Sequence, residues 1–318
     1  MYKVPVLFII YKNPGITKKV FEKIRELKPQ KLYISADGPK SDLLSDCKEI
    51  NETRKVTEFV DWDCIVSRRY SDKNMGCKLG VSSAITWFFE TEKEGVILEY
   101  DCLPDLSFFT FCEQLLEKYR NTDNIFSISG NNFDFITHQN KAISDTSVSY
   151  SFSNLSKIWG WATWKRAWDK FDITMNDFPH FQESQKIQSL IKGRKNQKYW
   201  IGKMKDVYDG RNNSTWGFIW LYTLLNNSSF CITPNVNIVS NIGFGTGATH
   251  AKDESSRFSK METKSINEII HPQSICADLE SDFRFTSFLR KSEMKNEMIV
   301  KIKNLIPHSF KELYKKWK

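Results

Sequence analysis

The chain has 318 residues, of which 40% are hydrophobic and 14% aromatic, so it can form one large or two modest domains with a sizeable core. Its formal net charge of +8 suggests anionic partners: nucleotide phosphates, an acidic membrane surface or nucleic acid. The seven cysteines contain no Cys-x-x-Cys pair, which argues against a zinc site or a disulfide framework and for a reducing compartment. The sequence predicts no signal peptide and, without a run of about 18 apolar residues, no transmembrane helix.

The first hundred residues alternate between predicted strands and predicted helices. Apolar runs indicate strands at 4–11, 31–36, 64–67 and 96–98. The helices between them are expected after Asn13-Pro14, over about 43–60, and over 79–90. Strands that alternate with helices form βαβ units, so a mostly parallel sheet is expected.

The fourth strand runs directly into an acidic segment. Residues 96–98 are followed by Glu99-Tyr100-Asp101, and alternation along a strand puts Glu99 and Asp101 on the same side. Ligands bind at the carboxyl ends of strands in open α/β sheets, and carboxylate oxygens there suit Mg²⁺ or Mn²⁺ carrying a phosphorylated substrate. Asp37 follows the second strand and is expected near the same edge. The plainer interpretations are a charged strand end for Glu99 and Asp101, and a turn residue for Asp37.

A tryptophan-rich segment lies near the middle of the chain. Trp161, Trp164 and Trp168 have helical spacing, which is typical of core. Trp161 also fits a second interpretation, in which its indole lies against a sugar ring while Lys165 and Arg166 face a diphosphate. The segments around it predict a helix at 106–119, a strand at 125–130, basic helices at 183–211, a helix at 216–225 and two short strands at 230–240.

The last part of the chain holds two further candidate segments. A loop over 241–250 has three glycines in five residues, which allows close backbone approach to a ligand, and it ends in His250. His250 is a candidate for a metal ligand, a phosphate contact or an ordinary surface residue. The tail over 299–318 is basic and amphipathic, and it predicts either a segment that lies on anionic membranes or a docking helix.

The order of these motifs resembles a known family. From about residue 4 to 250 the chain looks like the GT-A-fold nucleotide-diphospho-sugar transferases, related to glycosyltransferase family two and often labelled haemolysin-activation-like in bacteria. The motifs that carry the resemblance are Tyr11-Lys12-Asn13-Pro14, Ala36-Asp37-Gly38-Pro39, Asn74-Met75-Gly76-Cys77, Ile97 through Pro104, Trp159 through Trp164, and Ser240 through Gly245 with Ala248-Thr249-His250.

The resemblance implies roles for individual residues. Glu99-Tyr100-Asp101 would be the acidic metal motif, usually Asp-x-Asp, with Asp101 as the metal ligand. His250 can join Asp101 in coordinating Mn²⁺. The remaining donor-binding residues implied by the motifs are Tyr11, Asn13 and Asp37 at the base and ribose, and Lys78 near the diphosphate.

The catalytic base is not implied by the resemblance. Relatives often carry Asp one residue after the Trp that matches Trp216, and this chain has Gly217 there. Asp134, Asp206 and Asp209 are candidates by location only.

Together these features predict an α/β protein: a GT-A domain over 1–255, with a Rossmann-like, mostly parallel sheet flanked by helices. Its nucleotide-binding half is 1–130, its acceptor-side, partly helical half is 131–255, and basic C-terminal helices form an extension over 256–318. The expected activity is that of a hexosyltransferase-type glycosyltransferase dependent on Mn²⁺ or Mg²⁺. It would use a nucleotide-sugar donor and a glycan or lipid-linked acceptor in bacterial surface polysaccharide synthesis, in the cytoplasm or at the inner face of its membrane.

Two alternatives remain at this level. A sugar nucleotidylyltransferase would need a glycine-rich, Arg-bearing loop after the first strand, and Tyr11-Lys12-Asn13-Pro14 is not such a loop. A non-catalytic glycan- or nucleic-acid-binding protein is permitted by the basic charge, although the sequence contains no recognised nucleic-acid motif, so no nucleic-acid partner is expected.

Overall fold

The computed structural model describes residues 1–40, 43–133, 147–245, 256–259 and 261–305, except for the side chains of 296, 297 and 299–305. The first hundred residues form alternating strands and helices, as the sequence predicts. These elements are β1 (Val6–Ile10), α1 (Pro14–Leu27), β2 (Lys31–Ala36), α2 (Leu44–Val56), β3 (Ile65–Tyr70), α3 (Gly76–Phe89) and β4 (Glu94–Glu99). β1 pairs in parallel with both β2 and β4, and β2 pairs in parallel with β3.

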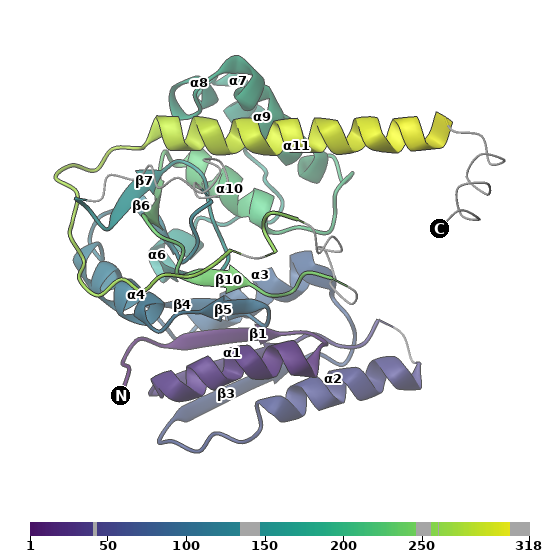
Figure 1. Ribbon diagram of the computed structural model, residues 1–318, viewed down its shortest axis with the longest axis vertical. Coiled ribbons are helices and arrows are strands. Elements are labelled where there is room, and N and C mark those ends of the chain that lie inside the picture. The colour runs from purple at the N-terminus through teal and green to yellow at the C-terminus, as the bar shows by residue number, and fades with distance from the viewer. Residues whose placement is uncertain (41–42, 134–146, 246–255, 260, 306–318) are drawn as a thin grey trace.

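The second part of the chain extends the same sheet. Its elements are β5 (Cys102–Pro104), α4 (Ser107–Lys118), β6 (Ile125–Ser129), β7 (Tyr150–Ser153), β8 (Trp161–Trp164), α6 (Lys165–Trp168), α7 (Phe178–Glu183), α8 (Ile187–Leu190), α9 (Arg194–Tyr208), α10 (Gly217–Asn226), β9 (Phe230–Pro234), β10 (Val239–Asn241) and α11 (Leu279–Leu305). Figure 1 shows their arrangement.

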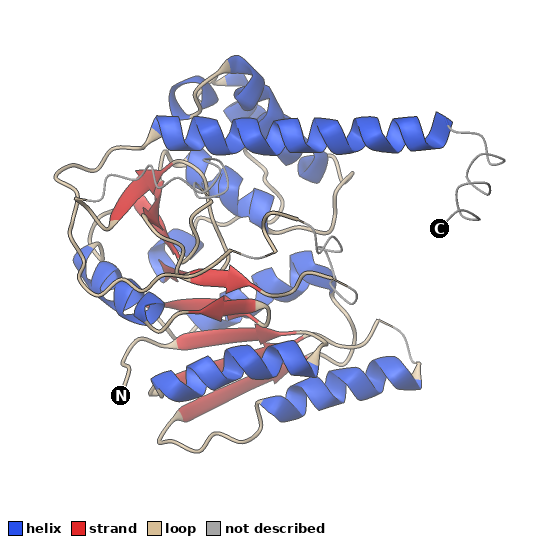
Figure 2. Cartoon of the chain, in the orientation of Figure 1, coloured by secondary structure: helices blue, strands red, loops and turns tan. Residues whose placement is uncertain are grey.

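Eight strands of the described chain form one sheet in the order β3-β2-β1-β4-β8-β6-β9-β7. β8 is antiparallel to β4 and β6, and β7 is antiparallel to β9, so the other six strands share one direction. Helices cover both faces of the sheet (Figure 2). The predicted mostly parallel α/β sheet flanked by helices is therefore confirmed, and it is the arrangement expected of a GT-A-like fold.

The core lies on both faces of β1. All five residues of this strand are buried. Val6, Phe8 and Ile10 pack into the cluster that includes α1 and α4, whereas Leu7 and Ile9 pack into the cluster that includes α3 and α10. A strand covered on both faces is apolar at every position, which explains why the apolar run at the start of the chain predicts it well.

The tryptophan-rich segment differs from the helical spacing predicted for it. Trp161–Trp164 is strand β8, and only Lys165–Trp168 is helical. Trp161 packs against Trp168, Trp216 and Trp220 in the cluster beside α3, while Trp164 lies on the opposite face of the sheet. Trp161 and Trp164 lie on opposite faces of the sheet. Trp168 packs on the same face as Trp161 because it belongs to the short helix α6 rather than to β8.

The C-terminal segment includes a long helix that the sequence does not predict with these bounds. The first half of α11 packs on α9 and on the sheet: Phe285 joins the cluster of α7–α10, and the buried Asp282 accepts hydrogen bonds from the Ser153 hydroxyl (2.5 Å) and the Asn154 amide (2.8 Å). Its second half projects past the body of the protein on the side of the carboxyl ends of β1 and β4 (Figure 1). In the described part of the chain, no helix is long and apolar enough to cross a bilayer.

Candidate functional site at the carboxyl edge of the sheet

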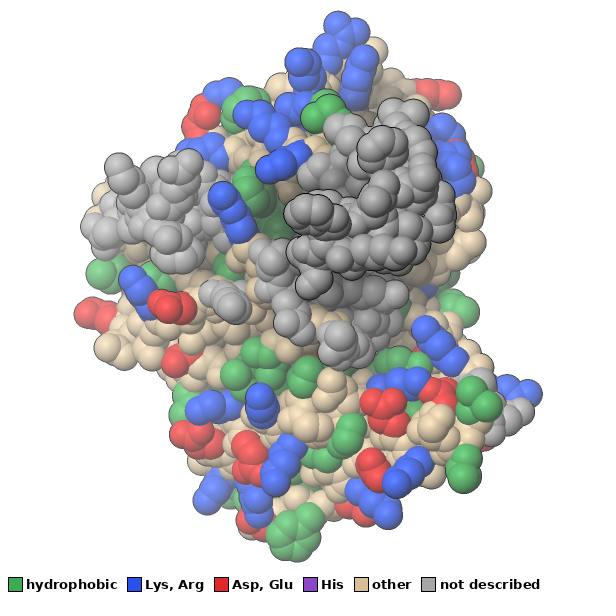
Figure 3. Space-filling model, turned by 45° about the vertical axis from the view of Figure 1, so that its right-hand side comes forward, with side chains coloured by type: hydrophobic (Ala, Val, Ile, Leu, Met, Phe, Trp, Pro, Cys, Tyr) green, Lys and Arg blue, Asp and Glu red, His purple; other side chains and the backbone are tan. Residues whose placement is uncertain are grey.

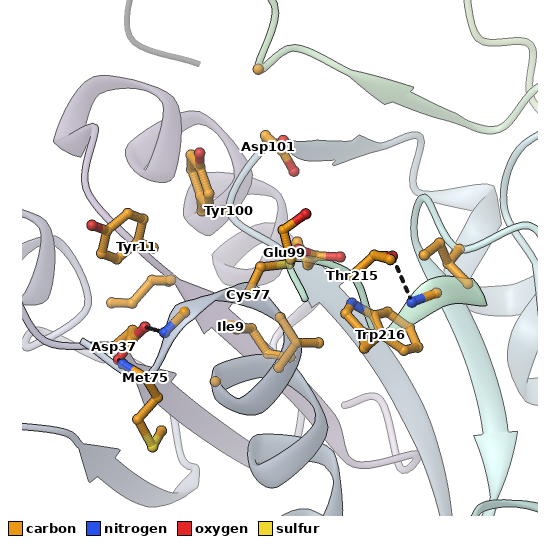
Figure 4. Close-up of a pocket in the computed structure, with 18 of the residues that line it drawn as sticks. Ile9, Tyr11, Asp37, Met75, Cys77, Glu99, Tyr100, Asp101, Thr215 and Trp216 are labelled. Atoms are coloured by element: carbon orange, nitrogen blue, oxygen red, sulfur yellow. Dashed lines mark hydrogen bonds between the residues drawn. The ribbon is translucent and has the colours of Figure 1, made fainter. Parts of the chain in front are cut away.

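A cavity of about 1000 Å³ opens at the carboxyl ends of β1, β2 and β4 (Figure 4). Its walls come from these strand ends, the start of α3, residues 158–159, the 211–217 segment before α10, and the residues at and just after the end of β10. Among the predicted site residues it is lined by Tyr11, Asp37, Glu99 and Asp101. The expectation that acidic residues after different parallel strands meet at one edge therefore agrees with this structure.

Asp101 is held by the chain that follows β10. The Asn241 amide donates to its Oδ2 at 3.2 Å, and the Ile242 backbone N–H donates to its carbonyl at 2.8 Å. Gly243 lies against the carboxylate: a β-carbon there would be 2.5 Å from Oδ2. Only glycine fits at 243 without displacing Asp101. The glycine-rich loop was expected to approach a ligand closely, but at Gly243 its backbone approaches the carboxylate of Asp101.

Glu99 is the second carboxylate in the cavity. It ends β4 and accepts no hydrogen bond from a described residue. Burial and, to a smaller extent, the negative charge of Asp101 raise the pKa of Glu99 to about 8. Two carboxylates that repel each other in a partly buried site favour a bound cation or proton.

The carboxylate of Asp37 is already fully hydrogen-bonded. Its Oδ1 accepts from the Gly38 and Met75 backbone N–H groups, both at 2.8 Å. Its Oδ2 accepts from the Asn74 amide at 2.9 Å and from the Gly76 N–H at 3.1 Å. These four bonds match the roughly four lone-pair positions of a carboxylate. Asp37 therefore fixes the start of α3 against the end of β2, on the wall of the cavity.

Tyr11 presents an unsatisfied polar group. Its hydroxyl is buried and has no hydrogen-bond partner among the described residues. Burial, followed by the charges of Asp37 and Glu49, raises the pKa of Tyr11, so the hydroxyl stays protonated and can donate. Buried polar groups in native proteins are nearly always paired, and Tyr11 lines the cavity, so its hydroxyl is available to a ligand or water there.

Asn13 and Lys78 do not line the cavity. Asn13 has a left-handed backbone (φ 57°), and its side chain caps α1 by accepting from the Ile16 N–H at 3.0 Å. Lys78 lies in the first turn of α3, one residue after Cys77, which does line the cavity.

Three residues of the tryptophan-rich segment are not brought to this site, which corrects the interpretation that places them at a donor. Trp161 is buried within its aromatic cluster. The Lys165 backbone N–H donates to the Lys93 carbonyl, before β4 begins, and its ammonium pairs with Asp169; Arg166 donates to the carbonyl of Tyr119. The reason is that β8 is antiparallel to β4, so its carboxyl end points to the opposite edge of the sheet.

The base candidates also lie away from the cavity or outside the described residues. Asp206 and Asp209 both pair with Arg211, and Asp209 also pairs with Lys205. Arg211 itself lines the cavity, which the sequence analysis did not foresee. Asp134 and His250 lie outside the described residues.

The 211–215 segment is a further part of the site missed from sequence. All five residues line the cavity, and Thr215 Oγ1 accepts from the Gly217 N–H at 3.2 Å, at the start of α10 (Figure 4). A polar run of Arg, Asn, Asn, Ser and Thr just before an apolar helix is the signal that points to it. A β-carbon at Gly217 would be 2.9 Å from the side chain of Ile158.

The described residues contain no group of three His, Cys, Asp or Glu side chains placed to hold a metal ion. Glu99 and Asp101 are nevertheless hard oxygen donors, and Mg²⁺ is usually bound through one or two carboxylates together with substrate phosphates and water. The residues present therefore fit a cation that arrives with a diphosphate, rather than a closed protein cage.

No protein-family model matches this chain, and no curated protein matches it either. Solved structures with some similarity include a cytidylyltransferase from Leptospira borgpetersenii serovar Hardjo-bovis (TM-score 0.31, 13% identity, 54% of this chain and 64% of that one). They also include a UDP-glucose pyrophosphorylase complexed with UDP-glucose (0.30, 11%, 52% and 78%). A third is mouse xyloside xylosyltransferase 1 (0.32, 10%, 71% and 82%). The chain thus spans less than two thirds of the length of the cytidylyltransferase.

Proposed function

We propose that the protein is a metal-dependent glycosyltransferase that moves a sugar from a nucleotide-diphospho-sugar to a glycan or lipid-linked oligosaccharide. The observation that carries this proposal is the cavity at the carboxyl edge, where Glu99 and Asp101 lie with the Tyr11 hydroxyl, which has no hydrogen-bond partner among the described residues. Its volume of about 1000 Å³ is at the upper end of the range for small-molecule sites, which suits a donor together with part of an acceptor.

In this proposal Asp101 and Glu99 face the diphosphate. Breaking a sugar–phosphate bond develops negative charge on the departing nucleoside diphosphate, and a bound divalent cation supplies the positive charge that stabilises it. Asn241 and Gly243 fix the direction of the Asp101 carboxylate, so little reorganisation is needed when the donor binds. His250 is proposed to join this site from the end of the same loop.

The nucleoside is proposed to lie toward Tyr11 and Asp37. The Tyr11 hydroxyl, which has no partner among the described residues, would donate a hydrogen bond to the base or ribose. Asp37 would act mainly by holding the start of α3 in place, because its own oxygens are already occupied.

The acceptor is proposed to enter beside the 211–215 segment. Its amides and hydroxyls can bind sugar hydroxyls, and Arg211 is kept in place by Asp206 and Asp209. An inverting reaction also needs a base for the acceptor proton. Glu99 is the cavity carboxylate without a hydrogen bond from a described residue, so it is the proposed base. A bound cation beside it would favour the deprotonated carboxylate, which burial and Asp101 otherwise disfavour by raising its pKa.

The test is to incubate the full chain and Mn²⁺ with a panel of nucleotide-sugars and to separate the products. Release of nucleoside diphosphate supports glycosyl transfer or its hydrolytic side reaction. Formation of nucleoside triphosphate from nucleotide-sugar and pyrophosphate would instead identify a nucleotidylyltransferase. Nucleotide-independent binding of glycans with no product would identify a non-catalytic protein.

A further inference from the structure

The end of the molecule opposite α1 and α2 carries a surface rich in Lys and Arg. Lys and Arg predominate where α7–α9 and α11 lie, whereas both signs mix at the other end (Figure 3). The exposed cations of this α9–α11 face are Arg194, Lys195, Lys198, Lys291 and Lys295. None of these five forms an ion pair with a residue in the described part of the chain.

Among the described side chains, no acid of these two helices pairs with any of the five cations, and Asp206 of α9 pairs with Arg211. Glu280 pairs with Lys192, and Glu293 accepts from Tyr199 (2.8 Å) and pairs with Lys203 (2.8 Å). The remaining acid at the start of α11, Asp282, is buried. The five cations therefore act together on whatever approaches this surface.

The packing of α9 on α11 places Lys195, Lys291 and Lys295 beside the contact between the two helices, whereas Arg194 and Lys198 lie on the outer side of α9. The seam is formed by Asn196 with Ser287 (3.1 Å), Trp200 with Thr286 (2.9 Å) and Lys203 with Glu293. These pairs show that the two helices run in the same direction. Lys195 stands one turn before Tyr199 of the seam, while Lys291 and Lys295 stand one and two turns after Ser287, because residues four apart share a helix face.

Exposed apolar side chains accompany these lysines. Met294 is 58% exposed and Met298 59% exposed, and with Lys291 and Lys295 they follow i, i+3, i+4, i+7 spacing on one side of α11. Basic side chains mixed with exposed methionines suit a surface that offers both phosphate headgroups and acyl chains. The phosphates of a nucleic acid would pair with the cations, but the methionine side chains would stay exposed to water.

We infer that the α9–α11 face binds anionic phospholipid headgroups. The second half of α11 projects on the side of the carboxyl ends of β1 and β4 (Figure 1), the edge of the sheet that carries the cavity, so a bilayer held by this helix would lie near the proposed site of a lipid-linked acceptor. The inference deepens the proposed function by supplying the surface on which it operates. Vesicle binding is measured without substrate, so its result is separate from whether sugar transfer is found.

The test is flotation of the full chain with phosphatidylcholine vesicles, with and without 30 mol% phosphatidylglycerol as a chosen composition, at low and high salt. Wild type is expected to bind only the anionic vesicles and to be released by salt. The variant K195Q/K198Q/K291Q/K295Q is expected to lose roughly 100-fold or more in partitioning, because each lysine near an anionic surface contributes roughly fivefold. The matched control is K18Q/K19Q/K48Q/K55Q on α1 and α2, with the same change in net charge and equally exposed positions.

Loss of binding in the face variant but not in the control supports the inference, with circular dichroism confirming that both are folded. Three results would overturn it: no binding by wild type, equal binding by the two variants, or binding that disappears only when residues 306–318 are removed. Tight binding of single-stranded RNA or duplex DNA, lost in the face variant, without vesicle binding would assign the face to nucleic acid instead.

Discussion

The backbone of Gly243 lies directly against the carboxylate of Asp101, and a β-carbon at 243 would be 2.5 Å from Oδ2 and 2.7 Å from Cβ of that residue. The two residues come from distant parts of the sequence, and β10 brings them together by pairing with β5. The orientation of the Asp101 carboxylate, the proposed metal ligand, therefore depends on Gly243, which has no side chain.

Gly243→Ala is expected to displace Asp101 and lower transfer activity at least about tenfold, since misplacement by 1 Å can cost on the order of 100-fold. Overpacking should also cost about 1–3 kcal/mol of unfolding free energy. The control is Gly202→Ala, because no atom lies near its added β-carbon and alanine stabilises a helix interior by about 0.5–1 kcal/mol. Wild-type kcat in Gly243→Ala would contradict the positioning role.

Asp101→Asn keeps the shape of the side chain but removes its charge. Activity is expected to fall by orders of magnitude while thermal unfolding stays cooperative. Glu99→Gln separates two roles: a higher Mn²⁺ requirement indicates a ligand, whereas a lower kcat at an unchanged Mn²⁺ requirement indicates the base. Metal titrations of initial rate measure both. Normal turnover in Asp101→Asn with metal still required would remove Asp101 from the mechanism.

Tyr11→Phe is expected to separate binding from stability. The hydroxyl has no partner among the described residues, so removing it should leave the unfolding free energy unchanged or slightly higher. Affinity for nucleoside diphosphate should fall about fivefold, the value of one hydrogen bond of about 1 kcal/mol. Tyr2→Phe is the opposite control, since its buried hydroxyl donates to the Phe109 carbonyl at 2.9 Å: stability should fall and affinity should not. Calorimetry with equal affinity for Tyr11→Phe and wild type would count against the contact.

Asp37→Ala removes an acceptor for two backbone N–H groups at the start of α3. We expect a loss of about 2 kcal/mol or more in stability, because hydrogen bonds to a charged group contribute about 1.5–3 kcal/mol each. Affinity for the intact donor and for free nucleoside diphosphate should fall by a similar factor, since the shared nucleoside side of the cavity is disturbed. Unchanged nucleoside diphosphate affinity in calorimetry would reduce Asp37 to a turn residue.

The buried Asp282 predicts a pH dependence of stability. Burial raises the pKa of Asp282 to about 6, with Lys157 and Asp278 as the charges that act on it and hydrogen bonds from Ser153 and Asn154. The unfolded value is about 3.9, so between about pH 4 and 6 the native state binds more protons and stability falls as pH rises. The unfolding free energy is expected to fall by about 2–3 kcal/mol across this window, because each unit of pKa difference corresponds to about 1.36 kcal/mol.

Urea unfolding of wild type and Asp282→Asn across pH 4–7.5 measures this effect as a difference. Other groups titrate in both proteins and cancel. The variant should lack this part of the slope, because asparagine keeps an acceptor for the Asn154 N–H but does not ionise. Parallel curves for the two proteins would show that Asp282 is not protonated in this window.

The first sheet and its carboxyl edge can be predicted from the amino-acid sequence. The strands at 6–10, 31–36 and 94–99 are covered on both faces and read as apolar runs, and the helices between them have local periodicity and capping signals. Because parallel strands end at one edge, the meeting of Asp37 with Glu99 and Asp101 follows from their positions alone. The individual strands and helices depend on neighbours within a few residues, which the sequence shows directly, and the shared edge follows from the parallel arrangement that their alternation predicts.

The residues that surround this edge depend on long-range packing and cannot be predicted from local sequence patterns. The antiparallel insertion of β8 between β4 and β6 sends Lys165 and Arg166 to the far edge, although their spacing after Trp161 is compatible with a donor site. The pairing of Asp206 and Asp209 with Arg211, and of Asn241 with Asp101, likewise depends on how distant segments return to the sheet. The periodicity of a segment predicts which face of a helix or strand is buried. It does not predict a contact such as that between Asn241 and Asp101, which are 140 residues apart, because packing of the whole core selects such contacts.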